Sequence, residues 1–90
     1  MILRKLDSWW IASTRSLMNP VDRRILKNVL QSGRTYPGDV LKSLGISPTL
    51  GLKKIIELRH KGYLIRDNEA STIRINPDKR KVVKIVTSGV

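Results

Sequence analysis

The chain has no cysteine and only one histidine, His60, among its 90 residues. Disulfide bonds and thiolate metal sites are therefore excluded, and the lack of cysteine fits a reducing compartment. A metal site would need carboxylate ligands almost exclusively, and only 7 Asp and Glu are present. We expect neither a bound metal nor any other cofactor.

Long apolar runs are also missing. Uncharged segments such as Ser8–Thr14 fall well short of the roughly 20 residues that a membrane-spanning helix needs. Asp7 and Arg15 interrupt the apolar stretch near the N-terminus, which makes it a poor signal peptide. The sequence therefore predicts a cytoplasmic, nucleoid-associated protein without a membrane partner.

The residues that enzymes use are scarce. No two carboxylates stand at a catalytic spacing, and the Ser and Thr residues at 13, 14 and 16 have no neighbouring histidine to activate them. The segment GISPTLG, residues 45–51, fails the pattern of a phosphate-binding loop. His60 stands near the predicted C-terminus of a helix, where it more often meets the helix dipole or a phosphate. We do not expect an enzyme.

Positive charge is what the chain has in excess. It carries 18 Lys and Arg against 7 Asp and Glu, for a formal net charge of +11. Such a charge causes self-repulsion in a small domain, so it indicates an anionic partner. Nucleic acid and an anionic membrane are the two obvious candidates, and the few cations near the N-terminus make the membrane the weaker one.

The N-terminal segment, residues 2–17, has the pattern of an amphipathic helix. Leu3, Leu6, Trp10 and Leu17 follow one another at spacings that share a helix face. This helix could fold onto the protein's own core or pair with a second copy to form a homodimer. We therefore divide the chain into an N-terminal helix at residues 1–18 and one domain at residues 19–90.

Three further helices are marked by their caps. The first is predicted over residues 19–32, from Asn19 and Pro20 to a stop at Gly33. The second covers residues 37–44, and the third covers residues 48–61 after a cap at Ser47. Only a tight turn separates the last two, which is typical of a helix-turn-helix.

The pattern changes to strands after Gly62. Residues 63–67 and the alternating segment STIRIN, residues 71–76, are predicted strands, and the β-branched segment KVVKIVT, residues 81–87, is predicted as another. Asn76, Pro77 and Asp78 form a turn signal between the last two. The sequence thus predicts a β-hairpin whose tip, residues 77–81, carries three consecutive cations.

A hairpin beside a helix-turn-helix indicates a winged DNA-binding domain. Helix 48–61 would enter the major groove, and the wing tip 77–81 would reach the minor groove or the backbone. If Leu52, Ile55 and Ile56 are buried, the opposite helix face meets the bases, with Gly51 allowing a close approach. The predicted DNA-binding residues are Arg34, Tyr36, Ser47, Thr49, Leu50, Lys53, Lys54, Glu57, Lys79, Arg80 and Lys81.

Two segments resemble the winged helix-turn-helix family, and within it the MarR-type regulators. LRHKGYLIR, residues 58–66, is similar to the end of a recognition helix, and DKRKVVKIVTSG, residues 78–89, is similar to the wing. The resemblance implies an α+β fold: a bundle of three helices with an additional N-terminal helix, followed by a β-hairpin wing. It also implies that Arg80 enters the minor groove and that Asp78 holds it. The stretch before Asp78 is longer than the family's usual wing, so we expect a third strand or an extended loop at residues 67–71.

These observations predict a sequence-selective protein that binds double-stranded DNA. A small transcriptional regulator that acts by promoter occlusion is the leading interpretation. One alternative is an architectural or partition-type protein that coats DNA with low sequence specificity. Another is an RNA-binding winged-helix module, because charge alone does not distinguish the two backbones.

Overall fold

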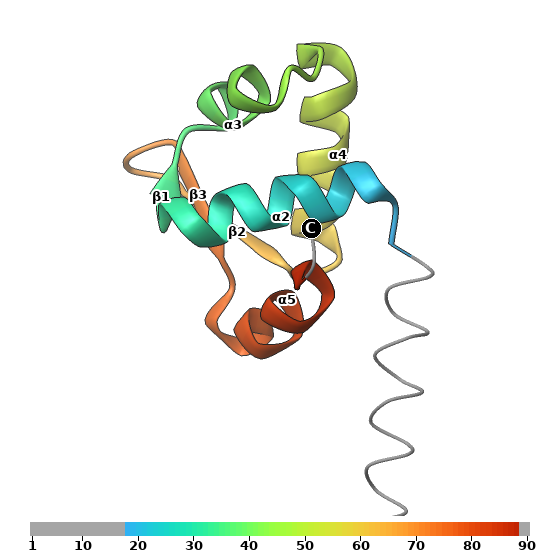
Figure 1. The fold of residues 1–90 in the computed structure, drawn as a ribbon. Helices are drawn as coiled ribbons and strands as arrows, with labels where there is room; N and C mark the ends of the chain where they lie inside the picture. Colours follow the sequence, from blue (N-terminus) through green and yellow to red (C-terminus); the bar gives the residue numbers. More distant parts are fainter. Residues whose placement is uncertain (1–17, 89–90) are drawn as a thin grey trace, which may run out of the picture.

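The computed structural model describes residues 18–88 (Figure 1). The predicted helix over residues 2–17, with its dimer contact, lies outside this range. The fold is α+β, as predicted. Its elements are α2 (Pro20–Ser32), β1 (Arg34–Thr35), α3 (Pro37–Leu44), α4 (Pro48–His60), β2 (Leu64–Asp67), β3 (Thr72–Ile75), the 3-10 turn η1 (Pro77–Lys79) and α5 (Arg80–Thr87).

Helix α2 begins and ends where its caps predict. The Asn19 side chain accepts a hydrogen bond from the Val21 backbone N–H at 2.8 Å, and Gly33 ends the helix at a positive φ of 78°. Ile25, Leu26 and Val29 are completely buried and form the centre of the core. Helix α2 is therefore the element against which the others pack.

Helices α3 and α4 form the helix-turn-helix. Gly45 ends α3 in the left-handed conformation, and Pro48 opens α4 three residues later. Gly51 lies where the two helices meet: a Cβ there would stand 2.6 Å from Leu41 Cδ1 and still closer to Cδ2. The close approach that Gly51 permits is thus between α3 and α4, and not to DNA as we expected.

The three strands of the described range form one antiparallel sheet in the order β1-β3-β2. Strands β2 and β3 make a hairpin in which Leu64 pairs with Ile75 and Asp67 pairs with Thr72. The hairpin tip, residues 68–71, is exposed. This hairpin is the wing, and the expected additional loop at residues 67–71 is its tip.

The prediction of a strand over residues 81–87 is wrong. Residues 80–87 form α5, in which Val83, Val86 and Thr87 are buried at helical spacing. The β-branched composition favours a strand, but burial of this stripe beside α2 overrides the weak local preference. Figure 1 shows α5 lying below α2, on the side away from α3.

The predicted wing tip at residues 77–81 is wrong for the same reason. Asn76 accepts a hydrogen bond from the Asp78 backbone N–H at 3.1 Å, which begins a helical turn and not a hairpin. Lys79, Arg80 and Lys81 therefore lie in η1 and at the start of α5. Asp78 and Arg80 do not occupy hairpin positions, so the wing roles that the MarR-type resemblance implied do not apply to them.

Between residues 18 and 88, none of the helices combines the length and the apolar content that crossing a membrane would require.

Candidate nucleic-acid interface

Helix α4 turns a mixed apolar and basic face outward. Gly51, Ile55 and Leu58 are buried, so the 100° turn per residue directs Thr49, Lys53, Ile56 and His60 away from the core. Together with the neighbouring Leu52, these residues form what we call the outer face of α4: Thr49, Leu52, Lys53, Ile56 and His60. All five are exposed.

Two core predictions on this helix are wrong. Leu52 is 46% exposed and Ile56 is 48% exposed, whereas the sequence pattern favoured burying both. The reason is that Gly51 packs against Leu41 of α3. This contact fixes the rotation of α4 about its axis and turns Leu52 and Ile56 outward.

Lys54 and Glu57 lie on the flank of the helix. The Lys54 Nζ lies 3.8 Å from Glu57 Oε2, one turn along α4. Such pairs stabilise a helix by only about 0.2–0.5 kcal/mol, so the contact can be exchanged for a phosphate. Glu57 is thus placed to orient a lysine.

The N-termini of α3 and α4 both leave backbone donors available. In the described structure neither cap residue, Tyr36 for α3 or Ser47 for α4, makes a side-chain cap hydrogen bond. Pro37 and Pro48 open these helices without an N–H group, so the donors that can reach a phosphate are the N–H groups of Gly38 in α3 and of Thr49 and Leu50 in α4. Tyr36 and Leu50, both predicted contacts, are exposed near these helix starts.

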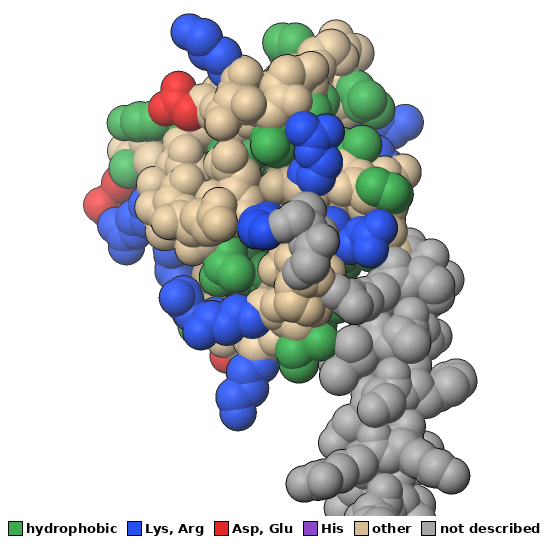
Figure 2. Space-filling view, viewed as in Figure 1, with side chains coloured by type: hydrophobic (Ala, Val, Ile, Leu, Met, Phe, Trp, Pro, Cys, Tyr) green, Lys and Arg blue, Asp and Glu red, His purple; other side chains and the backbone are tan. Residues whose placement is uncertain are grey.

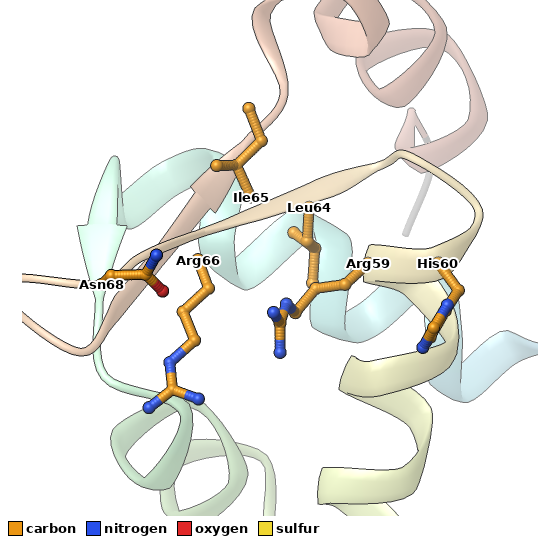
Figure 3. A pocket seen from close by; sticks show the side chains of 6 residues that line it. All are labelled: Arg59, His60, Leu64, Ile65, Arg66 and Asn68. Carbon is orange, nitrogen blue, oxygen red and sulfur yellow. The ribbon is translucent and has the colours of Figure 1, made fainter.

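A basic hollow lies between the end of α4 and strand β2. Its volume is about 370 Å³, and its lining residues are Arg59, His60, Leu64, Ile65, Arg66 and Asn68. Figure 3 shows the Arg59 and Arg66 side chains in the space beside β2, one from the helix and one from the wing. We call this the α4–β2 hollow. Two guanidinium groups in one open hollow can bind a phosphate backbone.

Sequence reasoning missed Arg59 and Arg66. Both lie in the LRHKGYLIR segment that carried the family resemblance, so a signal was present. The sequence pattern placed the hairpin tip at residues 77–81, so the wing was assigned to a different part of the chain from Arg59 and Arg66. Once β2 and β3 are paired, Arg66 stands next to the exposed tip.

The other predicted cations lie outside the helix-turn-helix. Lys79 lies beside Gly62, with its Cε 4.0 Å from the position that a Cβ would take there. Arg80 lines a second hollow of about 270 Å³ together with Arg34 and Arg74, at the end of α2. Arg34 also forms an ion pair with Asp67.

Positive charge is not confined to one patch. Figure 2 shows Lys and Arg side chains spread over the viewed face, where few Asp or Glu side chains are visible. Because counterions are released wherever cations meet phosphates, such a surface attracts nucleic acid from many orientations.

No protein-family model and no curated protein matches the sequence. One solved structure that is similar is that of a transcriptional regulator from Thermotoga maritima. It is 21% identical, with a TM-score of 0.69 over 94% of this chain and 66% of the regulator's chain. The chain thus spans just under two thirds of that regulator's length. The likeness shows that this chain has the winged-helix fold.

Proposed function

We propose that this winged-helix protein binds double-stranded DNA with sequence selectivity and acts as a transcriptional regulator. One observation carries the proposal: α4 and the wing frame one concave basic site. Arg59 and Arg66 both line the α4–β2 hollow, and Lys53 extends the charge along the outer face of α4. An α-helix fits the width of the major groove, with a hairpin beside it reaching the next stretch of backbone.

In this proposal the contacts divide into two classes. The outer face of α4, with Thr49 and Lys53, meets base edges, and Leu50, Lys54 and Glu57 lie at its sides. The starts of α3 and α4, at Tyr36 and Ser47, and the arginines of the α4–β2 hollow meet phosphates. The hairpin tip, residues 68–71, takes the place that residues 77–81 had in the sequence prediction. Lys79, Arg80 and Lys81 add contacts to phosphates from outside the helix-turn-helix, while Arg34 is engaged by Asp67.

Regulation by promoter occlusion is the mechanism we propose. The support is the similar fold of a protein described as a transcriptional regulator. A protein that covers a promoter blocks polymerase without any catalytic step, which suits a cytoplasmic, nucleoid-associated chain with few catalytic residue types. Pairing of two copies through residues 2–17 would present two α4 helices to one site.

Selection from random duplex DNA at near-physiological salt tests the proposal. Sequencing of the bound fragments should reveal an enriched motif, and an inverted repeat would support binding by two copies. Recovery of duplex without enrichment would contradict sequence selectivity. Preference for an RNA competitor over the recovered duplex would contradict DNA as the partner.

The spread of positive charge favours one other function. A protein that coats DNA with little sequence preference needs cations spread widely over its surface, and Lys and Arg side chains are spread over the face seen in Figure 2. The ratio of affinities for the selected motif and for unrelated duplex separates the two. Specific regulators bind their sites at least about 10³-fold more tightly, and a coating protein does not.

A further inference from the structure

We infer that α4 recognises thymine methyl groups in the major groove through Leu52 and Ile56. This inference rests on the proposed DNA-binding function and adds the class of base that the helix selects. Leu52 and Ile56 belong to the outer face of α4, which the sequence pattern had assigned to the core.

The exposed apolar side chains gather on this helix. Among residues 18–88, the large exposed hydrophobic residues are Tyr36, Leu50, Leu52, Ile56 and Ile85, and three of these five lie on α4. A single exposed leucine is ordinary on a protein surface. Leu52 and Ile56, about 40° apart around the helix, share one face, and neighbouring exposed apolar side chains indicate a binding surface.

The packing of α4 against the core does not depend on the side chains of Leu52 and Ile56. Ile55 and Leu58 supply its buried contacts, and Gly51 supplies its closest contact with α3. Leu52 and Ile56 could therefore be polar without loss to the core. Their apolar character is explained by what the outer face meets.

The occupant must match both cations and apolar groups. Lys53 stands beside Ile56 on the outer face of α4, and Arg59 and Arg66 line the α4–β2 hollow at the C-terminal end of the helix. The thymine side of the major groove presents a methyl group between two anionic backbones, so it matches both features. An ordinary apolar protein surface would leave Lys53 and the arginines without anionic partners.

The spacing of the pair makes the inference specific. Four residues of helix advance by about 6 Å, and successive bases on one strand are about 3.4 Å apart. Leu52 and Ile56 therefore reach thymines one or two steps apart. The motif recovered by selection should contain two such thymines.

Replacing thymine by deoxyuridine removes only the methyl group and tests the inference directly. Anisotropy titrations of the full chain would compare the selected duplex with duplexes that carry uracil at one thymine at a time. We expect about fourfold weaker binding at each of the two thymines, which corresponds to the loss of about 0.8 kcal/mol for one buried methyl.

Alanine variants connect the effect to the residues. In Leu52→Ala and Ile56→Ala the uracil penalty should fall at one thymine each, because partners in contact are not additive. Ile85→Ala on α5 is the matched control and should keep both penalties. Circular dichroism would confirm that the three variants fold, as expected for exposed positions.

Each outcome decides. Specific binding that is indifferent to uracil would overturn the inference and leave the proposed function in place. Recovery of duplex with no enriched motif would overturn the inference and the sequence selectivity, and would leave only DNA binding in place. Absence of duplex binding would overturn both the inference and the proposed function. Self-association that Leu52→Ala and Ile56→Ala abolish, with DNA affinity unchanged, would assign the outer face to a second copy of the chain instead.

Discussion

Arg34 and Asp67 form an ion pair across the sheet, with Arg34 Nη1 3.5 Å from Asp67 Oδ2. Arg34 lies in β1 and Asp67 ends β2, so the pair spans the intervening strand β3 just below the wing tip. The ion pair engages Arg34, which the sequence predicted to contact DNA. Exposed pairs of this kind contribute only about 0–1 kcal/mol to the free energy of folding. The larger effect of the Arg34–Asp67 pair is that it keeps the Arg34 guanidinium from a DNA phosphate.

Asp67→Asn should strengthen DNA binding, because it removes a negative charge at the wing and releases Arg34 for a phosphate. We expect the slope of log K against log salt to steepen by up to about 0.9, the value of one phosphate contact. Glu69→Gln, at the exposed tip, removes the same charge without releasing Arg34 and is the control. Equal changes of slope in both variants would show that Arg34 gains no contact.

Arg66→Ala should weaken DNA binding more than Arg80→Ala. Arg66 shares the α4–β2 hollow with Arg59, whereas Arg80 lies at the start of α5 in the second hollow. Titrations at several salt concentrations should show the slope reduced by about one unit for Arg66→Ala. A larger loss for Arg80→Ala would instead make the second hollow the main phosphate contact.

Asn76→Ala should destabilise the fold. The Asn76 side chain donates from Nδ2 to the Gly62 carbonyl at 2.9 Å and accepts from the Asp78 backbone N–H at 3.1 Å. It therefore fixes the start of η1 to the turn that follows α4. We expect a loss of about 1–3 kcal/mol in the free energy of unfolding, measured with urea.

Asn68→Ala at the exposed wing tip is the matched control, and it should change stability by no more than about 0.5 kcal/mol. If Asn76→Ala were equally harmless, the turn after α4 would be held by other contacts.

Gly51→Ala should also destabilise the fold, because its Cβ would overlap the buried Leu41 side chain. Overpacking of this kind costs about 1–3 kcal/mol. In Gly38→Ala no atom of the described residues lies within 4 Å of the new Cβ, so its urea midpoint should stay the same or rise. Full stability of Gly51→Ala with reduced DNA affinity would instead return Gly51 to the DNA surface.

The helix-turn-helix was predictable because its signals are local. Asn19, Ser47, Gly33 and Gly45 stand at helix ends, and the caps of α2, α3 and α4 fall where these residues predict. Caps depend on a few neighbouring residues and hardly on the rest of the fold. The fold class followed from the order of the helices and the hairpin.

The wing was misplaced because tertiary contacts decide between helix and strand at residues 80–87. Val83 and Val86 favour a strand locally, but their spacing also suits a helix that packs on α2. The outer face of α4 was misread for a related reason. The pattern of Leu52, Ile55 and Ile56 does not reveal which of them faces α3, since that depends on the contact between Gly51 and Leu41.

Amide chemical shifts recorded while duplex DNA is added test the central claim most directly. The account predicts that the largest changes occur at the start of α3, along α4 from Thr49 to His60, and in the wing from Arg66 to Ser71. The buried stripe of α5 at Val83 and Val86 should change little. Changes confined to α5, with α4 and the wing unaffected, would contradict the account.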